Sequence, residues 1–304
     1  MLHTLIRAAT CALAGLVFGA SIAAQAADAV HFKPDEFAWE FEQSAQQCIA
    51  RRSLTAGTRQ MQLELRKNSP RDTFQVIVLG EELKATSGPG KIRLSSADKP
   101  AEAGLFTQIK LKNHQGGVIF VMAILRNDTD PPYPAGKLWP SELSSAESTD
   151  ATAAIGVAEA DSLYLDGFFT EQLVLETGPW ADILSSMDAC TDKLMASWGI
   201  QPEIHRSLSR PTQLSNGEEV SKALATLYKR GAINPKASTF VDFRVLVDEI
   251  GKATDCYVTP PADPRFSEKV CNIVESTARL EPALASSGQA VSSYFINRVY
   301  FKGD

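Results

Sequence analysis

The feature that most constrains the fold of this chain is an alternation of apolar residues close to its C-terminus. In the stretch FVDFRVLV, apolar side chains occupy every second position from Val241 to Val247. A period of two is typical of a β-strand, and with Asp242 and Arg244 between the apolar positions it predicts a half-buried strand. The composition of residues 248–251 indicates a turn, after which residues 253–259 can return as a second strand.

The residues after this hairpin predict one helix and two further strands. Ser267 is expected to cap a short helix whose apolar residues recur on one side. A third strand over residues 279–285 turns at residues 286–288, and a last strand, rich in β-branched and aromatic residues, covers residues 291–301. The expected order is therefore strand, strand, helix, strand, strand.

This order, and three short motifs within it, resemble the C-terminal domain of the TonB family. Cys256 and Cys271 also stand where one subgroup of that family has a cysteine after the first hairpin and another in the helix. The resemblance covers residues 232–304, which we assign to one domain. The motifs are the hairpin around Gly251, Arg279-Leu280-Glu281-Pro282-Ala283 and Ser287-Gly288-Gln289-Ala290-Val291.

The resemblance implies a small sheet that captures an extended peptide. In the TonB family a receptor segment adds to the sheet as a further strand, held by main-chain hydrogen bonds and selected by alternate side chains. The matching surface here is the last strand, with the segment 232–238 close by. The alternative is that this edge ends a stable domain, or is covered by another chain. The residues expected to form the binding edge are Val291, Ser293, Phe295, Asn297 and Val299.

The N-terminus has the pattern of a secretory signal peptide. Arg7 precedes an uncharged apolar run over residues 8–24, and Ala24-Gln25-Ala26 supplies small residues before a cleavage site. We therefore expect residues 1–26 to be removed and the mature chain to be periplasmic. The alternative is an uncleaved anchor in the inner membrane, although the run is short for a span of about 20 apolar residues.

Four cysteines follow the expected signal peptide, and an even number in an exported chain suggests disulfides. Three pairings are possible among Cys48, Cys190, Cys256 and Cys271. We favour Cys256–Cys271, which would tie the hairpin to its helix, and Cys48–Cys190 within the preceding domain. The rival is a metal site, which we do not expect because the chain has no Cys-x-x-Cys pair and its histidines are scattered.

Residues 27–199 are expected to form a β-rich domain closed by a helix. Period-two alternation predicts strands over residues 60–66 and 73–79, which suggests an antiparallel meander. Residues 162–176 are expected to form a hairpin about Gly167. With the C-terminal domain, this composition of elements predicts the α+β class.

The closing helix is expected over residues 180–198, because apolar residues recur there at helical spacing. Pro179 suits the start of this helix and Gly199 suits its end. Residues 127–152, rich in Asp, Pro, Ser and Thr, predict an exposed loop. Residues 200–231 are expected to be a polar linker followed by a helix that leads into the C-terminal domain.

No catalytic motif is recognisable in the sequence. Patterns such as Gly-x-Ser-x-Gly, His-Glu-x-x-His and Gly-x-x-x-x-Gly-Lys do not occur. His114 is expected in a turn and His205 in the linker, each without a visible orienting partner for general-base catalysis. A calcium site lacks EF-hand spacing, so a solvated loop is expected for Asp128, Asp130, Asp161 and Asp166.

The four tryptophans could line a ligand pocket, but we interpret three of them as core anchors and Trp139 as a loop aromatic. The core anchors are Trp39, Trp180 and Trp198.

The composition is that of an ordinary globular protein. The 304 residues are 44% hydrophobic and 22% charged, and the net charge of −6 gives no electrostatic support for nucleic-acid binding. We therefore expect a two-domain protein without catalysis, cofactor or metal, whose C-terminal domain binds a protein or peptide of the cell envelope, such as an outer-membrane receptor.

Two other functions stay open. The first is a membrane-anchored TonB-type energy transducer, although the family's Tyr-Pro is replaced by Ile233-Asn234-Pro235 and the sequence has no long Pro-rich spacer. The second is an envelope hydrolase that uses the N-terminal domain, with His114 as its base.

Overall fold

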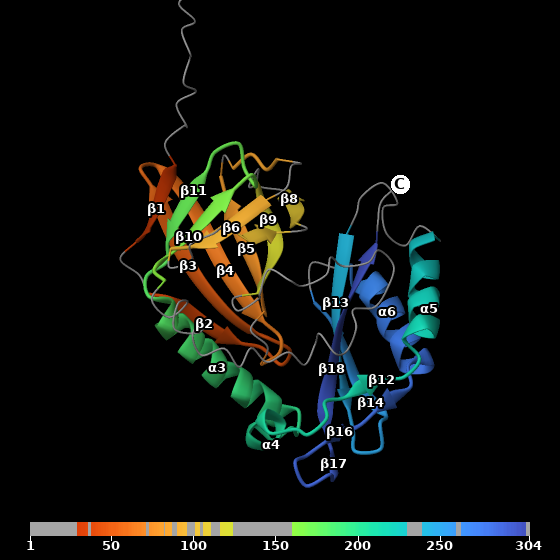
Figure 1. The fold of residues 1–304 in the computed structure, drawn as a ribbon. Coiled ribbons are helices and arrows are strands. Elements are labelled where there is room, and N and C mark those ends of the chain that lie inside the picture. Colours follow the sequence, from red (N-terminus) through yellow and green to blue (C-terminus); the bar gives the residue numbers. More distant parts are fainter. Residues whose placement is uncertain are drawn as a thin grey trace, which may run out of the picture.

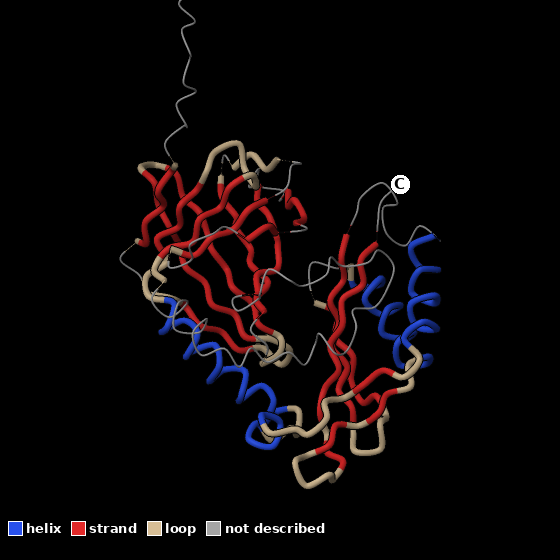
Figure 2. The backbone as a smooth tube through the Cα atoms, viewed as in Figure 1, coloured by secondary structure: helices blue, strands red, loops and turns tan. Residues whose placement is uncertain are grey.

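The computed structural model describes residues 29–35, 38–70, 73–81, 83–86, 90–95, 101–103, 106–110, 116–123, 160–229, 239–259 and 263–301. The described residues form two units: a large curled sheet with one long helix, and a smaller sheet backed by two helices (Figures 1 and 2). The protein is strand-rich and α+β, as expected. Several predictions concern residues outside the described ones: the expected signal peptide over residues 1–26, the expected loop over residues 127–152, the segment 232–238, His114, Asp128, Asp130 and Trp139.

Within the described residues, eleven strands form the curled sheet of the N-terminal unit. Their order is β7-β6-β10-β11-β1-β3-β4-β5-β9-β8, with β2 paired to β3 beside this path. β1 joins the two halves, because it pairs in parallel with β11 and antiparallel with β3. The strands are β1 (Val30–Pro34), β2 (Glu40–Gln43), β3 (Cys48–Ala56), β4 (Arg59–Lys67), β5 (Thr73–Gly80), β6 (Gly90–Leu94), β7 (Ala101–Ala103), β8 (Phe106–Lys110), β9 (Gly116–Ala123), β10 (Ser162–Asp166) and β11 (Leu173–Glu176).

Apolar side chains fill the concave side of this half-barrel. Phe32, Leu63, Phe120 and Phe168 are all fully buried, and the ring centroids of Phe120 and Phe168 lie 4.7 Å apart. The expected hairpin of β10 and β11 is present, and Gly167 at its turn has a φ of 76°. The interior of the half-barrel is therefore a packed core, as the period-two strands predicted.

One helix, α3 (Trp180–Ser197), lies along an end of the half-barrel (Figure 1). Its bounds agree with the expected helix, and its buried stripe includes Trp180, Ile183 and Leu194, which join the core of the half-barrel. Gly199, just past the C-cap, has a φ of 77°, which glycine adopts without strain. The short helix α4 (Pro202–Arg206) follows at once.

The C-terminal unit is built on three antiparallel strands in the order β14-β13-β18. These are β13 (Thr239–Val247), β14 (Ala253–Val258) and β18 (Ser293–Phe301). Helices α5 (Gly217–Lys229) and α6 (Pro264–Thr277) cover one face of this sheet, on the side away from the half-barrel (Figure 1). The alternating apolar residues of β13, from Val241 to Val247, are buried beneath them.

Two local expectations in this unit were wrong. The cap of α6 is Asp263, whose Oδ1 accepts the N–H groups of Arg265 and Phe266, while Ser267 lies inside the helix. Pro264 at the first helical position explains the earlier start, because proline is tolerated there.

The expected third strand is also not part of the three-stranded sheet. It is split at Pro282 into β15 (Leu280–Glu281) and β16 (Ala283–Leu284), because proline has no N–H to donate to a ladder. β16 pairs with β17 (Ala290–Val291), and β15 pairs with β12 (Gln213–Leu214). The segment expected to be a linker thus contains α4, which contacts α3, and β12, which belongs to the C-terminal unit.

Candidate functional site

The side chains expected to form the binding edge do not lie on an exposed margin. Ser293, Phe295, Asn297 and Val299 in β18 are 1%, 2%, 3% and 1% exposed. Phe295 and Val299 pack into the core beneath α5 and α6. Val291 belongs to β17, outside the three-stranded sheet. These side chains therefore build the core of the unit, and a partner added to β18 could not be selected by them.

One edge of β18 pairs with β13 along its whole length, from Thr239↔Phe301 to Val247↔Ser293. The other edge, which is the margin of the sheet, is partly occupied by a side chain of β18 itself. The backbone N–H of Arg298 donates to Oδ1 of Asn297 at 2.7 Å. A side chain thus takes the place of a neighbouring strand at this position.

The opposite margin of the sheet is formed by β14. The backbone N–H of Thr259 donates to the carbonyl of Asp242 at 2.8 Å, so the backbone groups of Thr259 point toward β13. Successive residues of a strand point their N–H and C=O groups to opposite edges, so those of Tyr257 also point toward β13. Those of Cys256 and Val258 then point outward. In the described part of the chain no backbone group pairs with them on that side, because the order of the sheet ends at β14.

Both disulfides favoured from the sequence are present. Cys256 of β14 is joined to Cys271 of α6, with an S–S distance of 2.03 Å and a Cα–Cα distance of 5.6 Å. Cys48 of β3 is joined to Cys190 of α3, with corresponding distances of 2.00 and 6.0 Å. One bond therefore holds the margin strand β14 against its helix, and the other holds α3 against the half-barrel.

The second face of the C-terminal sheet, expected to be exposed, is in contact with the N-terminal unit around Arg244. At its centre Arg244 of β13 is fully buried. Its Nη1 donates to the carbonyl oxygens of Gln46 at 2.9 Å and Asn68 at 3.0 Å, and its Nη2 donates to Oε1 of Gln46. The guanidinium also lies 3.6 Å from the ring centroid of Trp198. One side chain thus joins the two units.

The charge of Arg244 is poorly compensated in this position. Burial lowers the pKa of its guanidinium to about 10, against a smaller opposing effect of Asp255. Burial likewise raises the pKa of the nearby Tyr257. Among the described residues, Nε of Arg244 has no hydrogen-bond partner. The guanidinium of Arg244 is therefore a desolvated charge whose described hydrogen-bond acceptors are all neutral oxygen atoms.

Apolar and amide contacts surround Arg244. Met195 and Ile200, at the end of α3 and just beyond it, pack with Tyr294 and Ile296 of β18. The side-chain amide of Asn68 donates to Oγ1 of Thr259 at 2.6 Å. The interface thus combines a small apolar cluster with hydrogen bonds from residues at one end of the half-barrel.

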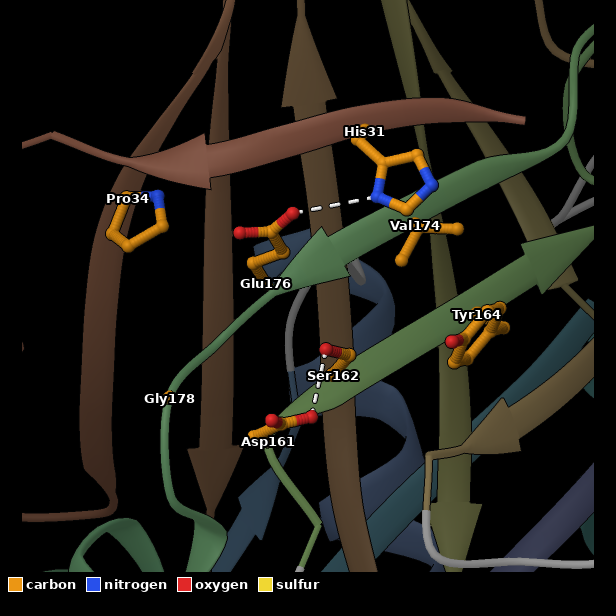
Figure 3. A pocket seen from close by; sticks show the side chains of 8 residues that line it. All are labelled: His31, Pro34, Asp161, Ser162, Tyr164, Val174, Glu176 and Gly178. Carbon is orange, nitrogen blue, oxygen red and sulfur yellow. Dashed lines mark hydrogen bonds and ion pairs between the residues drawn. The ribbon is translucent and has the colours of Figure 1, made fainter. Parts of the chain in front are cut away.

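A groove of about 400 Å³ lies on the outer face of the half-barrel, over β1, β10 and β11 (Figure 3). Figure 3 shows the ring of His31 and the carboxylate of Glu176 pointing toward each other, with Nδ1 and Oε1 3.3 Å apart. Oγ of Ser162 donates to Asp161 instead. The strand register separates the Cα atoms of His31 and Ser162 by roughly 12 Å, so this serine is not placed for activation by that histidine.

The other residues considered from the sequence have structural contacts. His205 stacks on Tyr294 with ring centroids 4.7 Å apart, so it lies in the interface of the two units. Trp180 is fully buried, as expected for a core anchor. Trp39 donates its Nε1–H to the carbonyl of Thr177, and Trp198 donates to that of Ala45. None of the described helices is long and apolar enough to cross a membrane.

No protein-family model matches the chain, and comparison with curated proteins and with solved structures gave no match. The TonB-like character of the C-terminal unit therefore stays a prediction from its residues.

Sequence reasoning missed the interface around Arg244 because a charged residue between apolar ones normally marks an exposed face. Two signals pointed the other way. Leu246 is apolar on the supposedly exposed face of β13, and Tyr294 and Ile296 are apolar on the matching face of β18. Apolar residues on both faces of adjacent strands indicate a sheet that is covered on both sides.

Proposed function

We propose that the protein is an exported, non-catalytic protein of the cell envelope whose C-terminal unit is a binding or adaptor module for a polypeptide partner. The TonB-like motifs around Gly251, Pro282 and Gly288 support this proposal. The two disulfides are compatible with an exported protein. The partner is a protein of the envelope, for which an outer-membrane receptor segment is the family precedent, and it binds as an added strand.

The observation that carries this proposal is the margin of β14. The outward N–H and C=O groups of Cys256 and Val258 end the ladder within the described residues, and an extended peptide can pair with such groups. The bond between Cys256 and Cys271 holds β14 against α6, so little ordering is needed when a strand is added. We therefore place the strand addition at β14, in preference to β18.

A pair of variants at Val258 tests this placement. Val258→Pro removes the outward N–H, whereas Val258→Ala loses side-chain packing at the same position but keeps the N–H. The full-length wild-type protein and both variants are used as bait in envelope extracts, and captured proteins are quantified by mass spectrometry. We expect the alanine variant to keep its partner and the proline variant to lose about tenfold or more of the captured amount.

Amide hydrogen exchange provides a second readout that does not depend on a variant. With the captured partner bound to the wild-type protein, the amides of Cys256 and Val258 should become protected, because they enter a new ladder. Equal capture by the two variants, or binding without protection of these amides, would contradict strand addition at β14.

A further inference from the structure

The face of the C-terminal sheet that meets the N-terminal unit has the composition of a binding surface. Arg244, Tyr257 and Tyr294 lie on it, together with Leu246 and Ile296. Arginine and tyrosine, buried beside aliphatic side chains, are the residues most often found to dominate protein–protein contacts. In this structure the half-barrel occupies that surface through its own residues.

The half-barrel satisfies Arg244 only in part. Nη1 donates to two main-chain carbonyls, and Nη2 donates to the amide oxygen of Gln46. The Nε–Nη2 side of a guanidinium is the one that binds a carboxylate through two parallel hydrogen bonds. Within the described residues, that side holds one neutral oxygen, and Nε is buried without a partner. A carboxylate would supply the missing bond and would add to the partial charge compensation that Asp255 provides.

The described contacts that a competitor would have to break gather at one end of the half-barrel, and they include the rings of Trp198 beside Arg244 and of His205 beside Tyr294. The half-barrel reaches the C-terminal sheet through Gln46, in the turn before β3, and Asn68, directly after β4. The apolar contacts come from Met195 and Ile200, at the junction of α3 and the segment that enters the C-terminal unit. Contacts between domains of one chain that are small and polar are typically reversible.

We propose that the N-terminal unit is a removable cover on this face, and that an acidic polypeptide segment displaces it by binding a carboxylate to Arg244. The hydrogen bonds from Arg244 to the carbonyls of Gln46 and Asn68 show that the surface fits a main chain, and the partly compensated guanidinium, whose Nε has no partner among the described residues, selects for acid. This inference rests on the proposed function insofar as the occupant is a polypeptide, but it concerns a different surface from the margin of β14.

The test compares three full-length proteins with two synthetic peptides. Gln46→Ala with Asn68→Ala removes the two side-chain hydrogen bonds of the cover, to Arg244 and Thr259, and leaves the C-terminal face intact. Adding Arg244→Met to that pair keeps an apolar stem beside Trp198 but removes the charge. The probes are a short peptide of alternating glutamate and serine and its matched peptide with lysine in place of glutamate.

Binding is measured by titration calorimetry, and the spatial extent of each protein by small-angle X-ray scattering. We expect the acidic peptide to bind the double variant at least about tenfold more tightly than the wild type, since the wild type must first open. Adding Arg244→Met should abolish this binding, and the lysine peptide should bind none of the proteins. Saturation of the wild type with the acidic peptide should increase its radius of gyration.

The inference is overturned if the acidic peptide binds none of the proteins, binds wild type and double variant equally, or binds without Arg244. It is also overturned if the scattering does not change at saturation.

Val258→Pro, introduced into the double variant, separates the two proposals. It should leave affinity for the acidic peptide unchanged, whereas it should abolish partner capture through β14. Loss of capture together with no preference for the acidic peptide would retain the proposed function and reject the cover.

Discussion

Gly251 is the residue at which local backbone conformation and packing restrict the sequence most tightly. It closes the turn between β13 and β14 with a φ of 85°, a region that side chains with a Cβ rarely adopt. A Cβ at this position would lie 2.3 Å from the carbonyl oxygen of Leu280. Asp248 completes the turn, because its Oδ1 accepts the N–H groups of Ile250 and Lys252. The TonB-like hairpin motif thus has a physical reason for its glycine.

Gly251→Ala should lower the free energy of unfolding by more than about 2 kcal/mol, because left-handed strain and a clash with Leu280 act together. Gly288→Ala is the matched control. Gly288 has a φ of 81°, but no atom lies within 4 Å of the position that a Cβ would take, so the substitution should cost only about 1 kcal/mol. Urea unfolding of both variants measures the difference, and equal losses would mean that the contact with Leu280 relaxes.

At the scale of elements, each disulfide joins a helix to a strand. Cys48–Cys190 spans 142 residues and fastens α3 to the half-barrel, whereas Cys256–Cys271 spans 15 residues and fastens α6 to β14. The helices pack by their apolar stripes in any case, so the bonds act mainly on the unfolded chain. A longer closed loop restricts that chain more.

Replacing both cysteines of a pair by alanine should therefore destabilise the protein unequally. The loop-closure entropy predicts a loss of about 5 kcal/mol without Cys48–Cys190 and about 3 kcal/mol without Cys256–Cys271. Equilibrium unfolding in urea, monitored separately by tryptophan fluorescence and circular dichroism, gives both values. The reverse order would show that the shorter link stabilises the folded state directly.

At the scale of the whole molecule, Arg244 makes the joining of the two units dependent on pH. Burial lowers its pKa to about 10 in the folded protein, well below the ordinary value of an arginine, with Asp255, Tyr257 and Tyr294 acting in the opposite direction. From about pH 10 up to the higher pKa that arginine has in the unfolded chain, the folded state therefore binds fewer protons at this group than the unfolded state. Below this window Arg244 is charged in the folded protein, and the full free-energy cost of burying that charge lowers stability. Across the window the buried guanidinium loses its proton, so its contribution to stability should rise with pH.

The size of this effect is about 3 kcal/mol, from the size of the shift. The free energies of unfolding of wild type and Arg244→Met are measured in urea from about pH 9 to 11.5. The value for the wild type minus the value for the variant should increase as pH rises. Taking the difference between the two proteins removes the titration of lysines and tyrosines that do not interact with Arg244, whereas Tyr257, whose pKa is raised by burial against an opposing effect of Arg244, contributes to the difference. A constant difference over this range would show that the guanidinium is better compensated than its contacts indicate.

Much of the architecture follows from local patterns in the residues. Period-two runs predicted β4, β5 and β13, helical spacing predicted α3, and Gly167 marked the turn between β10 and β11. These elements were predictable because each is decided by side chains within a few positions of one another. The start of α6 and the division of the strand at Pro282 were missed, although Asp263-Pro264 and Pro282 carried the signals.

The candidate site was less accessible to such reasoning. Which margin of the C-terminal sheet offers backbone groups depends on the pairing of Thr259 with Asp242, on one edge, and of Arg298 with Asn297, on the other. The burial of Phe295 and Val299 depends on where α5 packs. Neither fact leaves a pattern in the strand itself, because a strand has the same alternation whichever of its edges is open.

Short segments of the sequence therefore determine the local structure of this protein: its strands, its long helix, its left-handed glycines and the positions of its cysteines. The assembly of those pieces follows from contacts between positions far apart in the chain. Arg244 meets the carbonyls of Gln46 and Asn68 across a sequence distance that no periodicity spans. Because burial and hydrogen bonding there depend on which surfaces come together, the same arginine would be an exposed strand residue in an isolated C-terminal unit and is a desolvated charge in the folded whole.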